Sequence, residues 1–245
     1  MTKKYYDLHI HSCLSPCGDE DNTPNNIAGM ASISGLNVIA LTDHNSCKNC
    51  PAFFEATKKY GITAIAGMEL TTSEDIHVVC LFEHLNDAMR FDEYVSQRQI
   101  KIKNRPEIFG NQTVLDKDDN PVLTIEDLLI LATSISISEV KDAVEGFNGV
   151  CYPAHIDRDA NGIIAILGTL PEDCPFDYYE LRDKENLSIY SQRYNIPADR
   201  FIIDSDAHYL TDICDGDAFF EIEHKNCSDE EIRASIFEIL RRKRT

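Results

Sequence analysis

Near its start the chain reads Tyr6-Asp7-Leu8-His9-Ile10-His11-Ser12, and far along the sequence it reads Asp206-Ala207-His208. Each stretch holds two residues of metal-ligand type separated by one residue. If both stretches lie on β-strands, side chains two positions apart point to the same face, where imidazole and carboxylate groups can converge on a metal ion. Because the two pairs are so distant in the sequence, they predict a closed sheet whose first and last strands meet.

The length and composition indicate one globular domain. A chain of 245 residues is long enough for a large α/β domain with a substantial core. It contains no run of about 18 apolar residues that could span a membrane, and no apolar signal segment precedes the first strand. We therefore expect a single domain over residues 1–245, a cytoplasmic location and no membrane partner. The nine cysteines are then expected to be reduced thiols.

The formal net charge of −19 bears on possible partners. Such a charge repels nucleic acid and anionic membranes at long range, so we expect no long duplex nucleic acid as a partner. A small phosphate-bearing substrate would have to be captured by local positive charge, which bound cations would supply. The oligomeric state is left open.

Short apolar strands alternate with amphipathic helices, which favours parallel strands joined by helical crossovers. The predicted strands cover residues 6–10, 38–42, 63–70, 77–82, 149–153, 178–181, 201–204 and 218–222. The predicted helices cover residues 23–34, 51–60, 86–97, 124–132, 138–145 and 188–194. A last helix is expected to start at Ser228, where the sequence SDEE reads as a capping box.

Residues 97–123 form the one irregular region. They contain Asn104-Arg105-Pro106 and a turn-forming run at 116–121, both of which break regular structure. A basic cluster falls inside this region of an otherwise acidic chain: Arg98, Lys101, Lys103 and Arg105. Because long loops in compact domains are often functional, we expect an insertion or lid that covers a phosphate substrate. A solvated helix face is the alternative.

Six of the eight histidines lie at the end of a strand-like segment or directly after one: His9, His11, His44, His77, His155 and His208. His84 and His224 do not join them. A single histidine in such a place is more often a hydrogen-bonded core or loop residue than a ligand. Six of them, accompanied by the acids Glu69 and Asp206, indicate a metal centre.

These residues occur in motifs that resemble the polymerase and histidinol phosphatase (PHP) superfamily of metal-dependent phosphoesterases. The matching stretches are DLHIHS at 7–12, LTDHN at 41–45, GME at 67–69, His77, PAHIDR at 153–158 and DSDAH at 204–208. Each is weak alone, but their order along almost the whole chain is highly specific. The resemblance implies an α/β fold, a distorted (β/α)7 TIM-like barrel with a metal site at the C-terminal ends of the strands.

The resemblance also implies nine ligands for two or three divalent ions: His9, His11, Asp19, His44, Glu69, His77, His155, Asp206 and His208. Mixed nitrogen and oxygen ligation suits Mn, Fe or Zn. The family's arrangement assigns one metal to His9, His11, Glu69 and Asp206. It assigns a second to Glu69, His77 and His155, and a third to Asp19, His44 and His208. Residues 12–19 are longer than the family's usual segment, so Glu20 or Asp21 could replace Asp19. An acid here favours nucleotide substrates over histidinol phosphate.

Three further residues are candidates for catalysis and substrate binding. The family context implies that Asp43 orients the cluster or handles a proton from water, and the alternative is a buried acid bonded to backbone. Arg158 and Arg182 could bind a substrate phosphate through their guanidinium groups. A surface ion pair is the alternative for each arginine.

Two cysteine pairs, Cys13 with Cys17 and Cys47 with Cys50, follow strands that carry metal motifs. Four thiolates could hold zinc or an iron–sulfur cluster. The spacing between the pairs matches no strong zinc-finger pattern, however. An additional thiolate site and ordinary packing therefore both stay open.

The implied activity is hydrolysis of a phosphate ester of a nucleotide or short oligonucleotide by a metal-activated hydroxide. The alternatives are a histidinol-phosphate-type phosphatase, an amidohydrolase-like metal hydrolase and a non-enzymatic metal-binding module. Amidohydrolases usually have a lone Asp as their final motif and many use a strand-end Lys, whereas this chain has Asp206-Ala207-His208 and no evident strand-end Lys. The complete ligand set counts against the non-enzymatic role.

Overall fold

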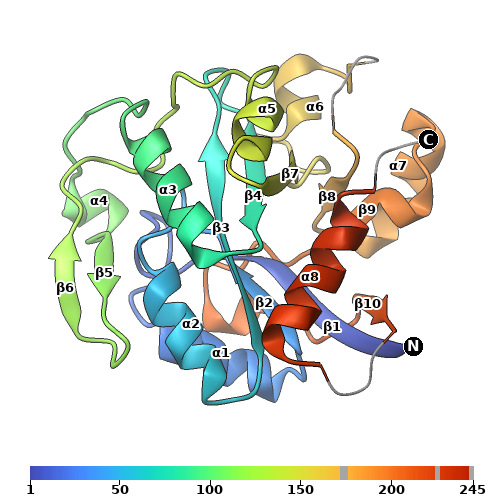
Figure 1. Cartoon of the computed structure of the whole chain (residues 1–245). Coiled ribbons are helices and arrows are strands. Elements are labelled where there is room, and N and C mark those ends of the chain that lie inside the picture. Colours follow the sequence, from blue (N-terminus) through green and yellow to red (C-terminus); the bar gives the residue numbers. More distant parts are fainter. Residues whose placement is uncertain (172–175, 224–226, 243–245) are drawn as a thin grey trace.

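The computed structural model describes residues 1–171, 176–223 and 227–242, so His224 lies outside the described residues. A curled six-stranded sheet forms the centre of the fold (Figure 1). Its strands are, in order, β10 (Phe219–Ile222), β1 (Thr2–Ile10), β2 (Val38–Leu41), β3 (Thr63–Thr71), β4 (His77–Phe82) and β7 (Gly149–Pro153). β8 (Tyr179–Leu181) and β9 (Phe201–Ile203) pair separately.

The two ligand pairs of the sequence meet as predicted, although the second pair lies in the segment after β9 and not on a strand. Ile10, between the two histidines of the first pair, forms a parallel bridge with Ala207, which lies between the two ligands of the last pair. The amide of His11 donates to the Ala207 carbonyl at 2.9 Å. These contacts confirm an α/β fold in which the first strand adjoins the segment after β9. The sevenfold (β/α) count stays a prediction.

The sheet is mixed, and this differs from the predicted parallel arrangement. β1, β2 and β3 run parallel, whereas β4 runs antiparallel to both β3 and β7. Only residues 72–76 separate β3 from β4, and a parallel crossover needs about a dozen residues or more. The antiparallel direction places His77, the first residue of β4, opposite Thr71 at the carboxyl end of β3.

Helices cover the outer face of the sheet. α1 (Pro24–Ile33), α2 (Cys50–Lys58), α3 (Leu85–Ser96) and α5 (Val140–Glu145) share one large apolar core with β2, β3 and β4. Figure 1 shows α1, α2 and α3 to the left of the central strands. α1 begins where its sequence predicts, because Pro24 takes the first helical position and the Thr23 side chain accepts from the Asn26 amide.

The inner face of the sheet packs on a second core, which α8 (Asp229–Leu240) closes. Side chains of three strands and of this helix share the core: Val38, Ile65, Val79, Ile236 and Phe237. α8 begins with the predicted capping box, in which the Ser228 hydroxyl accepts from the Glu231 amide and the Glu231 carboxylate accepts from the Ser228 amide. The inner core therefore packs against the strands that carry the histidine motifs.

An irregularity in β1 determines where the first histidine pair points. The register between β1 and β2 shifts between Asp7 and Ile10. Before the shift Leu8 packs in the inner core, whereas after it Ile10 packs in the outer core. Because side chains alternate along a strand, the shift turns both His9 and His11 to the inner face.

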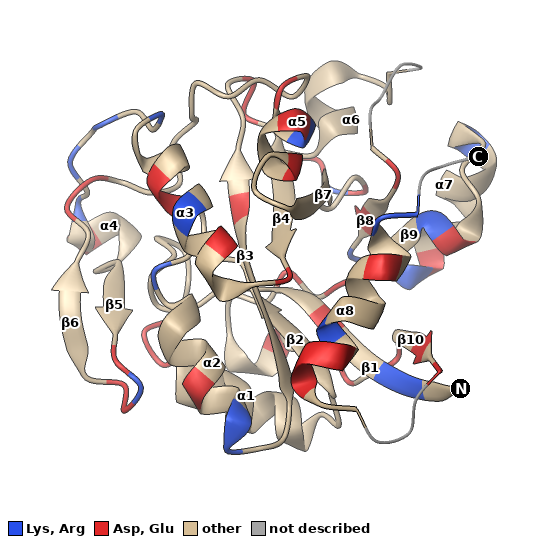
Figure 2. Ribbon diagram, in the orientation of Figure 1, with Lys and Arg blue, Asp and Glu red and all other residues tan. Residues whose placement is uncertain are grey.

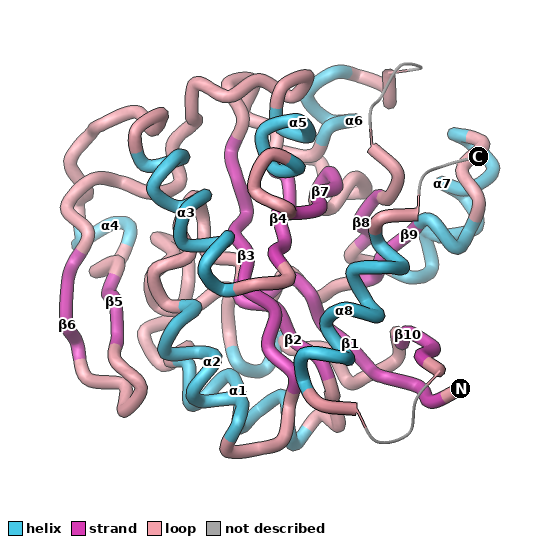
Figure 3. The backbone as a smooth tube through the Cα atoms, viewed as in Figure 1, coloured by secondary structure: helices cyan, strands magenta, loops and turns pink. Residues whose placement is uncertain are grey.

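The chain between α3 and α5 leaves the sheet and forms a peripheral layer. It contains α4 (Pro106–Phe109) and a hairpin of β5 (Thr113–Leu115) and β6 (Pro121–Thr124), at the left of Figure 1. Loops make up most of this stretch (Figure 3), and Lys and Arg residues occur on the loop between α3 and α4 (Figure 2). Lys103 pairs with Glu126 at 2.7 Å, and the Arg98 guanidinium lies over the Tyr94 ring. The lid role stays a prediction.

One predicted helix is wrong. Residues 124–132 form extended and turn structure instead. The Leu128 amide donates to the Ile102 carbonyl and the Asn104 amide to the Glu126 carbonyl, both at 2.8 Å. The Asn45 side chain also donates to two carbonyls of this segment. Pairing with residues 99–104 and these side-chain bonds outweigh helical propensity here.

The remaining elements are short. α6 (Ile163–Leu167) was not predicted, whereas α7 (Leu187–Tyr194) begins one residue before the expected position. Single 3-10 turns cover Lys184–Asn186, Ala198–Arg200 and Leu210–Asp212. In the described ranges, none of the helices has both the length and the apolar character that crossing a bilayer requires.

Candidate metal centre

Glu69 occupies the centre of the candidate site, near the carboxyl end of β3. Its Oε1 lies 2.8 Å from His77 Nδ1 and 3.0 Å from His155 Nε2, and its Oε2 lies 3.0 Å from His44 Nδ1. The three histidines come from the start of β4, the loop after β7 and the loop after β2. His77 reaches the cluster from the amino end of its strand, because β4 runs opposite to β3.

His9, His11, Glu69 and Asp206 form one buried group of donors. The Nε2 atoms of His9 and His11 are 3.1 Å apart, and each lies 3.3 to 3.5 Å from Asp206 Oδ1 and from a Glu69 oxygen. Four ligand atoms at about 2.1 Å from a tetrahedral zinc ion lie about 3.4 Å from one another. The spacing therefore fits a metal ion, and the group has the same members as the first expected ligand set.

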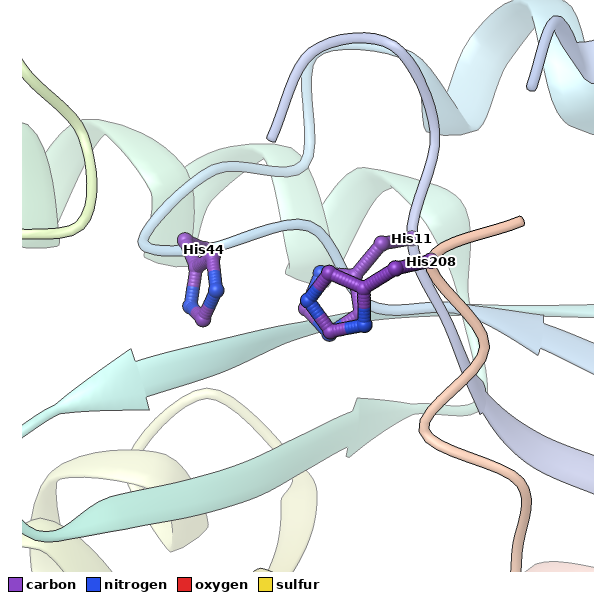
Figure 4. A group of neighbouring side chains, drawn as sticks. All are labelled: His11, His44 and His208. Carbon is purple, nitrogen blue, oxygen red and sulfur yellow. The ribbon is translucent and has the colours of Figure 1, made fainter. Parts of the chain in front are cut away.

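Two further groups overlap with the first. One contains His44, Glu69 and His77, where the expected set had His155, which also lies 3.0 Å from Glu69. The other contains His11, His44 and His208 (Figure 4). The rings of His11 and His208 stack with centroids 4.2 Å apart. Figure 4 shows His44 opposite this stack, on the neighbouring loop.

Asp19 joins none of these groups within the described residues. Its Oδ1 accepts a hydrogen bond from the Asp21 amide at 2.8 Å, and its own amide donates to the His208 carbonyl at 3.0 Å. Cys17 Sγ, two residues earlier, lies 3.2 Å from His44 Nε2. Asp19 as a ligand stays a prediction.

Glu180 is a candidate residue that the sequence analysis missed. It lies fully buried in β8, and its two carboxylate oxygens lie 3.0 and 2.9 Å from His9 Nδ1. A carboxylate accepts hydrogen bonds, so His9 Nδ1 carries the proton and the lone pair of His9 Nε2 is left for a metal. The available signal was an acid in the middle of a predicted strand between two apolar residues.

Asp43 is linked to the cluster through Ser15. Its carboxylate accepts from the Ser12 amide and from the hydroxyls of Ser12 and Ser15, each at 2.7 Å. Because the Ser15 hydroxyl donates to Asp43, its oxygen accepts from His11 Nδ1 at 2.9 Å. This leaves the lone pair of His11 Nε2 for a metal. The catalytic role of Asp43 stays a prediction.

Two arginines border the cluster at Asp206. Arg158 Nη1 lies 2.6 Å from Asp206 Oδ2, and Arg182 Nε lies 4.0 Å from the same oxygen. The other Asp206 oxygen faces His9 and His11. The two arginine side chains are 40% and 44% exposed, so they stand between the solvent and the buried donors. Their role in substrate binding stays a prediction.

The histidines of the cluster differ in their affinity for protons. Burial disfavours the charged form of each. For His9 and His11 the surrounding carboxylates outweigh burial, with Glu180 the largest contributor at His9, and raise the pKa of His9 well above its usual value and that of His11 to about 9. Burial prevails at the other two, lowering the pKa of His44 to about 3 and that of His208 to about 4.

Four buried atoms of the cluster have no hydrogen bond of suitable geometry, although His44 Nδ1 and Glu69 Oε2 lie 3.0 Å apart: His44 Nδ1, Glu69 Oε2, His155 Nδ1 and Asp206 Oδ1. They are half of the eight such side-chain atoms among the described residues. Leaving one buried polar atom unpaired costs about 1–3 kcal/mol, so native proteins keep few of them. Nitrogen and oxygen donors gathered in this way suit Mn, Fe or Zn. The residues present therefore fit the divalent metals that the sequence implies.

Backbone strain gathers at the same place. His155 has φ 30° and Asp206 has φ 52°. Residues other than glycine rarely adopt positive φ, which costs about 1–3 kcal/mol where it is unfavourable. Such conformations persist where the surroundings fix them, as at ligand sites. The two residues are held in place because His155 bonds to Glu69 and Asp206 to Arg158.

The four cysteines of the two pairs do not gather into a thiolate site. Cys47 and Cys50 both direct their Sγ atoms at the Gly67 carbonyl, at 3.1 and 3.7 Å, whereas Cys13 donates to a carbonyl of β5 and Cys17 lies beside His44. In the described part of the chain, no group of three or more metal-ligand residues with their ligand atoms within 4.8 Å of one another includes a cysteine.

Comparison with known proteins identifies relatives of the chain. The family model for the PHP domain matches residues 7–191, more than half of the chain. A 5′-3′ exoribonuclease of Haemophilus influenzae is 39% identical over 84 residues, which are 33% of this chain and 29% of that protein. A PolC-type DNA polymerase III of Caldanaerobacter subterraneus subsp. tengcongensis is 28% identical over 156 residues, which are 58% of this chain and 11% of that protein. The chain thus spans less than a third of either relative.

The fold is similar to that of endonuclease Q. The lesion-specific endonuclease PfuEndoQ of Pyrococcus furiosus matches with a TM-score of 0.63 and 20% identity, over 99% of this chain and 57% of that one. Endonuclease Q has also been solved with a 27-mer duplex that carries an abasic lesion at the active site. The expectation that long duplex nucleic acid is excluded is therefore wrong. It rested on whole-chain charge, whereas salt screens distant charges and the local charge at a binding face decides.

The motifs that carry the family resemblance come together in one cluster of metal-ligand atoms. The family model covers those motifs that lie before residue 191. The predicted family is therefore confirmed. The chain belongs to the PHP domain family.

Proposed function

We propose that the chain hydrolyses a phosphate ester of a nucleotide or oligonucleotide with two or three divalent metal ions. The proposed ligands are His9, His11, His44, Glu69, His77, His155, Asp206 and His208. The observation that carries the proposal is the convergence of imidazole and carboxylate atoms, 2.8 to 3.5 Å apart, around Glu69. The names of the exoribonuclease and endonuclease relatives support a nucleic-acid substrate.

Divalent ions held in this cluster would supply Lewis acidity to the phosphoryl oxygens and lower the pKa of water toward neutrality. The chain's own residues fix the direction of the donors. Glu180 orients His9, and Ser15, itself held by Asp43, orients His11, so that both Nε2 atoms face the cluster. In this proposal Asp43 is a positioning residue that does not touch the substrate.

Arg158 and Arg182 are proposed to bind the substrate phosphate. A guanidinium group can donate two parallel hydrogen bonds to phosphate oxygens. Both side chains are partly exposed beside Asp206, so they can reach an incoming phosphate without displacing the buried histidines. Their positive charge adds to the local attraction that an anionic chain needs for an anionic substrate.

The segment 97–123 is proposed to act as a lid within a single domain. It packs on the loop after β1: the Thr113 amide donates to the Cys13 carbonyl at 3.2 Å, and the Asn111 side chain donates to Glu20 at 2.7 Å. A movement of the hairpin would therefore reach the loop that borders the cluster. The sevenfold barrel and the cytoplasmic location remain part of this proposal.

The test is phosphate or nucleotide release from a panel of substrates. The panel contains nucleoside 3′,5′-bisphosphates, mononucleotides, short oligonucleotides, duplex DNA with and without an abasic site, histidinol phosphate and an aryl phosphate. Chelator-stripped protein is reloaded separately with Mn²⁺, Fe²⁺ or Zn²⁺. We expect metal-dependent release from a nucleotide or oligonucleotide, and its loss in His9→Ala.

The matched control is His84→Ala, because His84 is exposed and belongs to none of the donor groups. It should keep the wild-type rate. Release from histidinol phosphate alone would replace the nucleotide substrate with the alternative phosphatase. No release from any substrate by protein whose metal content is verified would overturn the proposal and favour a non-phosphate hydrolase or a binding role.

A further inference from the structure

The loop after β1 places a thiol beside the group formed by His11, His44 and His208, here called the outer group. Cys17 Sγ lies 3.2 Å from His44 Nε2, and His44 belongs to the group with His11 and His208 (Figure 4). Cys17 is exposed, so its position does not result from packing in an apolar core. Its neighbour in space is a nitrogen that could share a metal ion with it.

The backbone of the loop holds Cys17 in this position. The Ser15 amide donates to the Ser12 carbonyl and the Gly18 amide to the Ser15 carbonyl, both at 3.0 Å. A Cβ on Gly18 would lie 2.3 Å from the Ser12 carbonyl oxygen, so the close approach requires glycine. The His44 amide donates to Ser15 Oγ at 3.2 Å. The turn that carries Cys17 and the start of the His44 loop are therefore bonded directly.

The nearest acid in the loop is engaged elsewhere. Asp19 Oδ1 accepts from the Asp21 amide at 2.8 Å, which closes a local turn. Only the backbone of Asp19 contacts the cluster, through the bond from its amide to the His208 carbonyl. Cys17 is thus the residue of this loop whose side chain meets His44, whereas the Ser15 hydroxyl bonds to His11.

His44 lies between Glu69 and Cys17. Its side chain is 3% exposed, its Nδ1 lies 3.0 Å from Glu69 Oε2, and its Nε2 faces Cys17 Sγ. Ring atoms of His11, His44 and His208 lie within 4.8 Å of one another. A buried imidazole whose Nε2 faces a thiol, close to two other imidazoles, is an arrangement that a thiophilic metal ion satisfies.

We propose that Cys17 is the thiolate ligand of the outer metal, together with His44 and His208, in the place where the family pattern has an acid. The inference rests on the proposed metal centre but not on the proposed substrate. Coordination releases the thiol proton to solvent. Because sulfur is a soft ligand, the outer position would take Zn²⁺ or Fe²⁺ in preference to Mn²⁺.

The test is a titration of the chelator-stripped, reduced full chain with Co²⁺, followed by absorption spectroscopy. Cobalt–thiolate bonds give a near-ultraviolet charge-transfer band, which sites with only nitrogen and oxygen ligands lack. The variants are Cys17→Ser and Asp19→Asn. The matched control is Cys13→Ser. It removes another thiol from the same loop, and this thiol bonds to the Thr113 carbonyl and not to a histidine. Circular dichroism checks the fold of each.

The wild type, Asp19→Asn and Cys13→Ser should show the band. Cys17→Ser should lose it and bind the last equivalent of Co²⁺ at least about tenfold more weakly, with the earlier equivalents unchanged. A band that persists in Cys17→Ser, or weakened binding in Asp19→Asn alone, would overturn the inference. Co²⁺ binding without a band in the wild type would also overturn it and leave the metal centre standing, whereas no Co²⁺ binding at all would remove both.

Discussion

The metal centre has two halves, which differ in the hydrogen bonds that hold their ligand histidines. The inner half consists of His9, His11, Glu69 and Asp206. The outer half consists of His44 and His208, the two histidines that form a group with His11, with Cys17 beside His44. In the inner half Glu180 and Ser15 hold the Nδ1 atoms of His9 and His11. In the outer half, His208 Nδ1 bonds to the Asp206 carbonyl at 2.8 Å, and the side chain is 21% exposed.

The difference predicts that one cluster holds metal ions that exchange with solvent at different rates. The carboxylates around the inner half raise the pKa of His9 and His11, whereas burial lowers that of His44 and His208. The inner half therefore stabilises positive charge strongly, and ligands held by a second layer of bonds lose little freedom when a metal binds. We expect inner metals to bind tightly and the outer metal to exchange with solvent.

The strongest test removes the residue that joins the halves. Glu69 contacts histidines of both, with distances of 3.0 Å to His44 and 3.4 Å to His11. Glu69→Gln keeps the side-chain volume but removes the shared negative charge, so we expect turnover to fall about 10³-fold or more. Steady-state hydrolysis and metal content by mass spectrometry measure the effect.

The control for this variant is Glu55→Gln, which removes an exposed carboxylate paired with Lys58. It should leave turnover and metal content unchanged. If Glu69→Gln kept more than about a tenth of the wild-type rate, the two halves would not depend on a shared carboxylate, and the single cluster would have to be divided into independent sites.

The next test weakens only the inner half. Glu180→Gln replaces the carboxylate that accepts from His9 Nδ1 with a neutral amide. Outer-layer partners of metal ligands typically contribute 10- to 100-fold in affinity or activity, so we expect a loss of about that size for the first metal equivalents. The last equivalent should bind as in the wild type. An equal loss at every equivalent would mean that the two halves are not distinct.

A smaller effect is expected at the rim. Arg158→Ala removes a partly exposed guanidinium group beside Asp206, and we expect KM to rise about tenfold with kcat nearly unchanged, since solvent weakens exposed ion pairs. Arg158→Lys should recover part of the loss, and Arg193→Ala, an exposed arginine on α7, serves as the control. A fall in kcat with constant KM would instead assign Arg158 to the support of Asp206.

The sequence predicts the inner half better than the outer half for a physical reason. Ligand-x-ligand pairs on strands have a fixed period, so the spacing by itself predicts that the side chains of His9 and His11 share one face. Ligands on loops have no such period. The loop at residues 12–19 turns twice, and its bonds direct Cys17 rather than Asp19 toward His44.

Two other differences have the same origin in tertiary contacts. Glu180 lies in a predicted strand but belongs to no motif, and its role appears only when the fold brings its carboxylate to His9. Residues 124–132 have a helical pattern, yet pairing with residues 99–104 holds them extended. Local pattern thus predicts strand position and ligand type, whereas contacts between distant segments decide which side chain faces which.

The test with the smallest expected effect measures how the metal affinity of the inner half depends on pH. In the metal-free chain the pKa of His11 is about 9, so at pH 7 this side chain is protonated and must lose its proton before it can bind a metal. The affinity of the first equivalent should therefore rise about tenfold per pH unit for each proton released between pH 6 and 8, and level off above the pKa. Competition with a chelator at several pH values measures this slope.

Glu180→Gln should reduce the number of protons released, because Glu180 contributes most to the raised pKa of His9. A flat affinity across this range would mean that the inner histidines are already neutral, and that the halves differ in accessibility rather than in charge.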